Sequence, residues 1–183
     1  MNHERKLSCV RFPKTAAQRF PAQAGQLNAA FDARLRRRAL LAEHARDSKE
    51  KQWHLKRQIL PGIAAYETLQ TVLPKDEALQ TVHSYVEQLA KNAHRDFGPA
   101  AGFALTELQT GRGIWRIDMT KCPYHDTCVQ HGRPELCPCF CDSDDITYND
   151  LHPDLLWRRT KTLGRGNDCC DFCLKLAGKK SAG

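Results

Sequence analysis

Cysteine is the residue type in this chain whose number and spacing point most directly to chemistry. Eight of the nine cysteines fall between residues 122 and 173. Thiols at this density serve as nucleophiles, as metal ligands, in disulfides or as small core residues. The eight are Cys122, Cys128, Cys137, Cys139, Cys141, Cys169, Cys170 and Cys173. A cysteine-poor first half is thus joined to a second half that has the composition of a chemical site.

Two short cysteine spacings bear on a metal site, since structural zinc usually takes two closely spaced pairs of Cys or His ligands. Cys170 and Cys173 have the required interval, but no second pair with matching spacing accompanies them. The run Cys137-Pro-Cys-Phe-Cys141 has single-residue gaps. The sequence therefore predicts no cofactor, and it leaves open a mixed metal site completed by a histidine at position 125, 131 or 152.

Cys141 and Cys170 are the candidate nucleophiles, because a cysteine attacks as the thiolate and needs a nearby cation, base or helix N-terminus. Cys141 precedes Asp142-Ser-Asp-Asp145, which is typical of the cap and first turn of a helix. We expect the helix N–H groups to favour its thiolate and the aspartates to oppose it. Strand alternation places Cys170 on the same inward face as Phe172. For both cysteines, catalysis and simple packing stay open.

Composition and charge bear on the cellular location of the protein and on the partners it could bind. No stretch reaches the roughly 18 apolar residues of a membrane span, and the N-terminal residues lack the apolar core of a secretory signal. We therefore expect a cytoplasmic protein with reduced thiols. Residues 1–60 hold 14 Lys and Arg against 5 Asp and Glu. Because acidic residues are mixed in and no aromatic residues are interleaved for stacking, we expect a solvated helix face rather than a nucleic-acid site.

Helical periodicity dominates the first half. It predicts a long helix over residues 26–58, a second over 61–73 that begins at Pro61, and a third over 76–96. Residues 1–23 contain two prolines and little apolar periodicity, so we expect them to pack loosely and to be dispensable for folding. The inward positions expected in the long helix are Leu27, Phe31, Leu35, Leu41 and Trp53.

After Phe97 the residue pattern is no longer that of long helices. Residues 113–119 alternate as a half-buried strand does, and residues 122–152 are expected to form short helices and turns. Segments 155–163 and 169–176 flank a turn and predict an antiparallel hairpin. The predicted fold class is α+β, with N-terminal helices packed on a small antiparallel sheet that ends in a C-terminal β-hairpin. We divide the chain into a basic segment with the long helix, 1–58, and an α+β domain, 59–183, whose C-terminal half is Cys-rich.

Short motifs in the second half resemble the L-2-amino-thiazoline-4-carboxylic acid hydrolase family. They cover roughly residues 55–176 and are specific over 115–174. The motifs are Cys122-Pro-Tyr124, Pro134-Glu-Leu-Cys137, Phe140-Cys141-x-x-Asp144, Leu151-His-Pro153, Arg159-Thr-Lys-Thr162, Gly166 and Cys170-Asp-Phe172. The resemblance implies an α+β hydrolase that opens the ring of a cyclic amidine on a bacterial route to L-cysteine.

The resemblance also implies roles for particular residues. Cys141, Asp144 and Cys170 would be catalytic, and Arg159, Thr160, His152 and Tyr124 would bind substrate. Two routes stay open at the amidine carbon: attack by a cysteine thiolate, or attack by water that Asp144 activates. Either route gives a carbamoyl-cysteine type of product. Arg159 is expected to face inward and bind the substrate carboxylate with its planar fork, while Arg158 points to the other face of the strand.

A second class of function stays open. The ending Gly166…Cys170-Asp-Phe172 also resembles small-molecule-binding domains of the 4-vinyl reductase type, in which case the chain would be a sensor whose cysteines hold a metal or ligand. In both readings the expected partner is a small molecule, with no membrane. Assembly of several copies of the chain is left open.

Overall fold

The computed structural model describes residues 12–39, 44, 46–90, 98–111, 113–149 and 152–177. The first half is helical, as predicted. Its elements are α1 (Lys14–Arg19), η2 (Pro21–Gln23), α2 (Ala24–Ala39), α3 (Lys49–His54), η4 (Leu55–Ile59), α4 (Leu60–Leu69) and α5 (Lys75–Ala90).

The single long helix predicted over residues 26–58 is wrong, because α2 and α3 are separate elements. Leu27, Phe31 and Leu35 of α2 are buried as expected. Trp53 in α3 is 38% exposed, so that inward assignment fails, and Leu41 lies outside the described residues. A uniform run of helix-forming residues thus concealed a break that propensity alone does not reveal.

The second predicted helix does not begin at Pro61. Helix α3 continues through η4, a π-helical turn, directly into α4, and Pro61 lies in the first turn of α4. Proline has no N–H to donate, and its ring crowds the carbonyl four residues earlier. The wider π-helical turn before Pro61 accommodates both effects. The boundary drawn at residue 58 therefore falls within a continuous helix.

Part of the segment from residue 12 to residue 23 packs more tightly than predicted. Phe12 and Ala16 are buried in the core, and the Phe12 ring lies 5.6 Å from the ring of Phe31. The expectation of loose packing is wrong for Phe12 and Ala16, which pack in the core, and for Ala17 and Phe20, which pack partly buried against it. It holds for Pro21–Gln23, which have no buried residue. Residues 1–11 lie outside the described part of the chain.

The second half forms a four-stranded antiparallel sheet in the order β1-β2-β4-β3. Pairing of β3 with β4 confirms the C-terminal hairpin, although β3 ends five residues earlier than predicted. The strands and intervening helices are η5 (Pro99–Ala101), β1 (Ala104–Gly111), β2 (Ile114–Lys121), α6 (Pro123–Gln130), η6 (Pro134–Leu136), α7 (Cys137–Asn149), β3 (Leu155–Arg158), η7 (Leu163–Arg165) and β4 (Cys170–Leu176).

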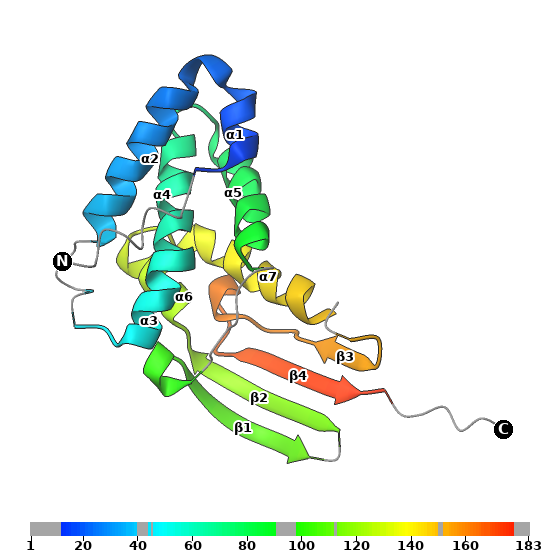
Figure 1. The fold of residues 1–183 in the computed structure, drawn as a ribbon. Coiled ribbons are helices and arrows are strands. Elements are labelled where there is room, and N and C mark those ends of the chain that lie inside the picture. The colour runs from blue at the N-terminus through cyan, green and yellow to red at the C-terminus, as the bar shows by residue number, and fades with distance from the viewer. Residues whose placement is uncertain are drawn as a thin grey trace.

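Helices and sheet form two layers, which confirms the α+β fold class. Figure 1 shows α7 beside β3 and β4, with α2, α4 and α5 extending away from the sheet. The inward side chains of the central strands, Ile117 and Met119 of β2 and Phe172 of β4, are buried against the helices. One hydrophobic core runs from Phe12 to Phe172 and joins the two halves of the chain.

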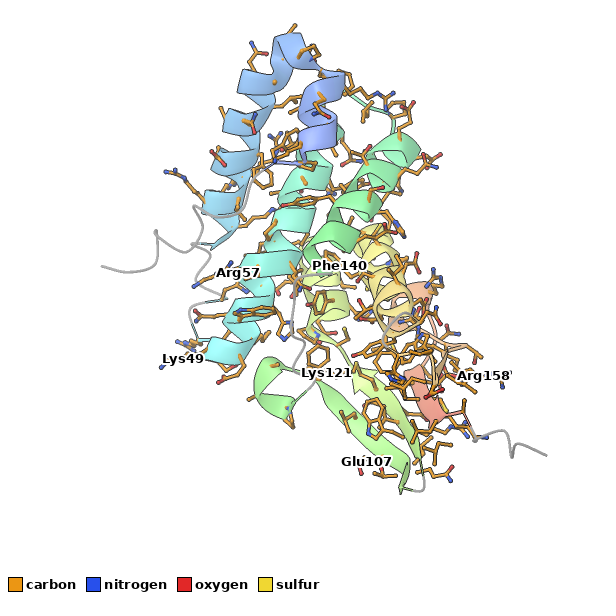
Figure 2. The ribbon with its side chains drawn as sticks, turned by 45° about the vertical axis from the view of Figure 1, so that its right-hand side comes forward. Lys49, Arg57, Glu107, Lys121, Phe140 and Arg158 are labelled. Atoms are coloured by element: carbon orange, nitrogen blue, oxygen red, sulfur yellow. The ribbon has the colours of Figure 1, made fainter. Side chains whose placement is uncertain are left out.

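Helix α7 approaches α4 closely where Phe140 meets Gly62. A Cβ atom on Gly62 would lie 2.7 Å from Cζ of Phe140, so only glycine leaves room for this ring. Figure 2 shows Phe140 where the helices meet the sheet, and Arg158 at the outer edge of the molecule. The close approach brings the acidic and cysteine residues of α7 over the buried face of β4.

Candidate active site

A small, partly open cavity lies between the sheet and helices α6 and α7. Its volume is about 20 Å³, which is close to the room that one water molecule needs. Four of the residues that the motifs predicted as catalytic or substrate-binding meet here. The lining residues are Phe103, Met119, Cys122, Tyr124, Phe140, Cys141, Asp144, Cys170 and Phe172.

Local structure explains why these residues converge. Phe140, Cys141 and Asp144 lie within one turn of α7, so they share a helix face. Cys170 and Phe172 alternate along β4 and point to the same side of the sheet, as the strand pattern predicted. Cysteine side chains from the loop before α6, from α7 and from β4 therefore line one space.

The expected start of the helix at Cys141 is wrong. Helix α7 begins at Cys137, four residues earlier, because η6 leads directly into it. Cys141 therefore lies one turn inside the helix, where the N–H groups are already hydrogen-bonded to carbonyl groups. The predicted stabilisation of a Cys141 thiolate by a helix N-terminus does not apply.

The cavity thiols are held in their neutral form. A hydrogen bond with Cys137 and burial raise the pKa of Cys141 well above its usual range, and nearby Arg159 and Thr162 only partly offset this. Burial raises the pKa of Cys122 to about 12. Since a cysteine attacks as the thiolate, these two residues are poor nucleophiles at neutral pH in this conformation.

Cys170 differs from Cys141 in its contact with the backbone. Burial raises its pKa to about 11, while the N–H of Leu163 opposes this by donating a hydrogen bond to Sγ at 3.3 Å. An N–H donor stabilises negative charge on sulfur. Of the two cysteines proposed as nucleophiles, Cys170 therefore has the surroundings better suited to a thiolate.

Arg159 faces inward and Arg158 is exposed, as strand alternation predicted. The Arg159 side chain is 2% exposed, and its guanidinium contacts three acceptors of the protein. Nη1 lies 3.3 Å from Oδ2 of Asp144, and Nη2 contacts Oδ2 of Asp145 at 2.7 Å and the carbonyl oxygen of Cys141 at 2.9 Å. Arg159 therefore fixes the Asp144 carboxylate at the cavity wall.

Thr160 and His152 lie outside the cavity. Thr160 is exposed and donates its main-chain N–H and its hydroxyl to the carboxylate of Asp171, at 2.8 and 2.6 Å. The ring of His152 is largely exposed and accepts the N–H of Asp154. The geometry thus brings Cys141, Asp144, Cys170 and Tyr124 together, with Arg159 directly behind them, and leaves these two residues apart.

Tyr124 links the cavity to two buried polar residues that the sequence did not single out. Its hydroxyl donates to Oε1 of Gln58 at 2.5 Å and lies 2.8 Å from Nδ1 of His54. Because the hydroxyl proton goes to Gln58, Nδ1 of His54 is the donor in the second bond. His54 directly precedes the π-helical turn and Gln58 lies within it. Such turns are often found at functional sites, but no sequence motif marks this one.

Gly164 is a second residue that sequence reasoning missed. A Cβ atom there would lie 2.8 Å from Sγ of Cys137 and 2.9 Å from Sγ of Cys141. The backbone of η7 therefore packs directly on these two sulfur atoms. Only the Gly in Leu163-Gly-Arg165 could have signalled such an approach, and glycine in a loop has many other causes.

A metal site was left open by the cysteine spacings. Within the described residues, no group of three or more His, Cys, Asp or Glu side chains is placed to hold a metal ion. The eight cysteines of the described residues are all free. In the same part of the chain, no helix combines the length and apolar character needed to cross a membrane.

A comparison with known protein families identifies the family of this chain. Residues 52–174 match the family model of L-2-amino-thiazoline-4-carboxylic acid hydrolase. The chain belongs to this family. The match covers the cavity, the π-helical turn and nearly all of the sheet, and it confirms the resemblance seen in the motifs. Neither the curated proteins nor the solved structures contain a match to the chain.

Proposed function

We propose that this member of the L-2-amino-thiazoline-4-carboxylic acid hydrolase family opens the ring of a cyclic amidine by adding water to the carbon between sulfur and nitrogen. The family name implies a hydrolase. The observation that carries the proposal is the Asp144 carboxylate, which lines the cavity while Arg159 holds it in place. A fixed carboxylate beside neutral thiols is suited to acid–base chemistry.

In the proposed reaction, Asp144 takes a proton from water as the water oxygen bonds to the amidine carbon. The bond from that carbon to the ring sulfur or ring nitrogen then breaks, and the leaving atom receives a proton. The neutral thiols of Cys141 and Cys170 are donors close to Asp144. With the carboxylated substrate of the family name, the product is a carbamoyl-cysteine on a route to L-cysteine.

Thiolate attack by Cys170 is the second route. Its sulfur would bond to the amidine carbon, the ring bond would break, and water would then release the product. The Leu163 N–H favours this route and burial opposes it. Because the cavity has room for about one water molecule, either route requires the surrounding side chains to separate when a ring enters.

Turnover of a panel of cyclic amidines, with products identified by mass, tests the proposal. We expect a product heavier than the substrate by one water molecule, and a loss of roughly 10²-fold or more in kcat for Asp144→Asn. Asp145→Asn, which keeps the cavity carboxylate, is the control. A covalent adduct on Cys170 in the intact-mass spectrum would favour the thiolate route, and binding without turnover of any amidine would favour a sensor.

We also propose a cytoplasmic location. All cysteines of the described residues are free thiols, and thiols are kept reduced in the cytosol. Fractionation of cells that express the chain, with immunodetection of each fraction, would test this.

A further inference from the structure

Helix α3 exposes an aromatic side chain that the sequence pattern placed in the core. Trp53 is 38% exposed, and its ring meets the buried His54 ring nearly at right angles, with 5.1 Å between the ring centres. Among the Phe, Trp and Tyr residues that the structure describes, Trp53 is the one that is exposed, while the others are buried or partly buried. The outer surface of α3 therefore offers an open indole face.

Basic residues lie on both sides of Trp53 along the helix. Residues three and four apart are neighbours on a helix surface. Lys49 lies four residues before Trp53, and Lys56 and Arg57 lie three and four residues after it. Because η4 continues α3 without a break, these positions form one strip, about 12 Å long from Lys49 to Arg57. Both of these end residues are exposed, and Figure 2 shows them on the outer side of the helix.

The strip carries an excess of positive charge. Residues 46–57 hold five Lys and Arg against two Asp and Glu, and one of the two carboxylates, that of Asp47, is bound by Lys51 at 2.8 Å. Exposed Arg36 and Arg37 lie in the last turn of α2, and that end of α2 points towards α3 in Figure 1. An anionic partner that approaches this side of the molecule therefore meets several cations and one indole.

The exposed indole distinguishes among the anionic partners that this charge would attract. Single-stranded nucleic acid is bound by cations that contact its phosphates and by aromatic rings that stack on its bases. An acidic peptide offers carboxylates for the cations but no base for the indole. A membrane surface takes up a helix with a broad apolar face, whereas the apolar face of this helix, with Leu55 and Ile59, is buried in the core. A nucleic-acid strand is therefore the partner that uses both features.

We infer that α3 and η4 form a binding surface for single-stranded nucleic acid. Lys49, Lys56 and Arg57 contact phosphates, and a base stacks on the indole of Trp53 between them. The expectation of a solvated helix face rested on the lack of an aromatic residue for stacking, and the exposure of Trp53 removes that ground. None of these four residues lines the cavity, so the surface is separate from the proposed site of hydrolysis.

Fluorescence anisotropy of the full chain with a labelled oligothymidylate of about ten nucleotides measures this binding. We expect a slope of log K against log salt concentration of about −2, since three phosphate contacts on a single strand each contribute about −0.7. Trp53→Ala should weaken binding roughly five- to hundredfold with little change in the slope. Lys49→Gln or Arg57→Gln should make the slope shallower by about 0.7. Arg158→Gln, at the outer edge of the molecule in Figure 2, is the control and should leave binding unchanged.

Three results would overturn the inference. The first is no binding of the oligonucleotide at about 50 mM salt. The second is a folded Trp53→Ala that binds as tightly as the parent chain, because charge alone would then explain the affinity. The third is binding of polyglutamate or of phosphatidylserine vesicles at least as tight as that of the oligonucleotide. All variants are first checked for a cooperative melt, and Trp53→Leu, which removes the ring but keeps an apolar side chain, gives the same comparison if Trp53→Ala does not fold.

Discussion

The carboxylate of Asp171 binds both the main-chain N–H and the hydroxyl of Thr160, eleven residues away, across the start of the β3–β4 connection. It also accepts the N–H of Lys161 at 2.5 Å. These hydrogen bonds join two family motifs that are separate in sequence, Arg159-Thr-Lys-Thr162 and Cys170-Asp-Phe172. They hold the backbone between Arg159 and Leu163, and Thr160 does not reach the cavity itself.

Asp171→Asn should lower the melting temperature in a pH-dependent way. Burial raises the pKa of Asp171, but the hydrogen bonds from Thr160 and Lys161 outweigh it and lower the pKa overall. A lowered pKa in the folded state stabilises the protein above the unfolded value of about 3.9 and is lost as the pH falls through the folded value. We expect a loss of about 1 kcal/mol near neutral pH, modest because the carboxylate is partly exposed.

Thermal melts of the parent chain and Asp171→Asn between neutral pH and about pH 3 would measure this difference. The gap between the two melting temperatures should narrow as the pH falls. Asp168→Asn is the control, since that carboxylate is exposed and pairs with the Lys161 side chain. A gap that stays constant with pH would mean that the charge of Asp171 does not stabilise the fold.

Gly164→Ala should destabilise the protein by overpacking. The added Cβ would meet two sulfur atoms at 2.8 and 2.9 Å, and insertions of this kind typically cost about 1–3 kcal/mol. Chemical denaturation measures the change in the free energy of unfolding. Gly25→Ala is the control, because a Cβ there has nothing within 4 Å and alanine is the better helix former. Equal effects of the two changes would show that η7 does not pack on Cys137 and Cys141.

Arg159→Lys should lower stability and kcat together. Lysine keeps the charge but loses the planar fork that serves three acceptors at once, so we expect a loss of about 1.5–3 kcal/mol in stability. The kcat should fall because Asp144 loses its fixed position. Arg158→Lys, on the exposed face, should change stability by less than about 0.5 kcal/mol. If Arg159→Lys instead raised only the KM of carboxylated substrates, Arg159 would be a substrate-binding residue after all.

The cavity thiols should resist alkylation in the folded protein. Their pKa values are raised by burial or by thiol–thiol hydrogen bonds, so at pH 7.5 a minor fraction is thiolate. Of the cysteines that the structure describes, partly exposed Cys173 should react first with iodoacetamide, and the reaction of Cys141 should become fast only after unfolding. Peptide mass mapping over time gives the order. Rapid native-state alkylation of Cys141 or Cys170 would reveal an activated thiolate and favour covalent catalysis.

The sequence best predicted the direction of side chains in strands that have one buried face, because their side chains alternate with every residue. Alternation correctly placed Cys170 with Phe172 and separated Arg159 from Arg158, because a strand residue has only two directions to choose from. It missed β1 almost entirely. That strand lies at the sheet edge with nearly every residue exposed, so no apolar alternation marks it.

The candidate site was only partly predictable for a similar reason. Motifs identified Cys141, Asp144, Cys170 and Tyr124, which the structure brings to one cavity. The partner of Arg159 was not predictable, because a sequence does not show whether an inward guanidinium meets a substrate or a carboxylate of its own chain. The start of α7 was misplaced for a local reason, since Asp142-Ser-Asp-Asp145 resembles a helix cap although the helix already runs through it.

The π-helical turn takes up one residue more than an α-helical turn does, so the chain from Leu55 to Ile59 turns about as far as a regular α-helix that is one residue shorter. If the same residues formed a regular α-helix, in which each residue turns the chain by about 100°, α3 would be rotated by roughly that angle about α4. His54 would then leave Tyr124, and the buried hydroxyl would lose a partner. Single-residue insertions are therefore expected to be tolerated far worse in this turn than single-residue deletions, which a regular α-helix can accommodate. A relative that lacks one residue here could hold its tyrosine from a regular α-helix.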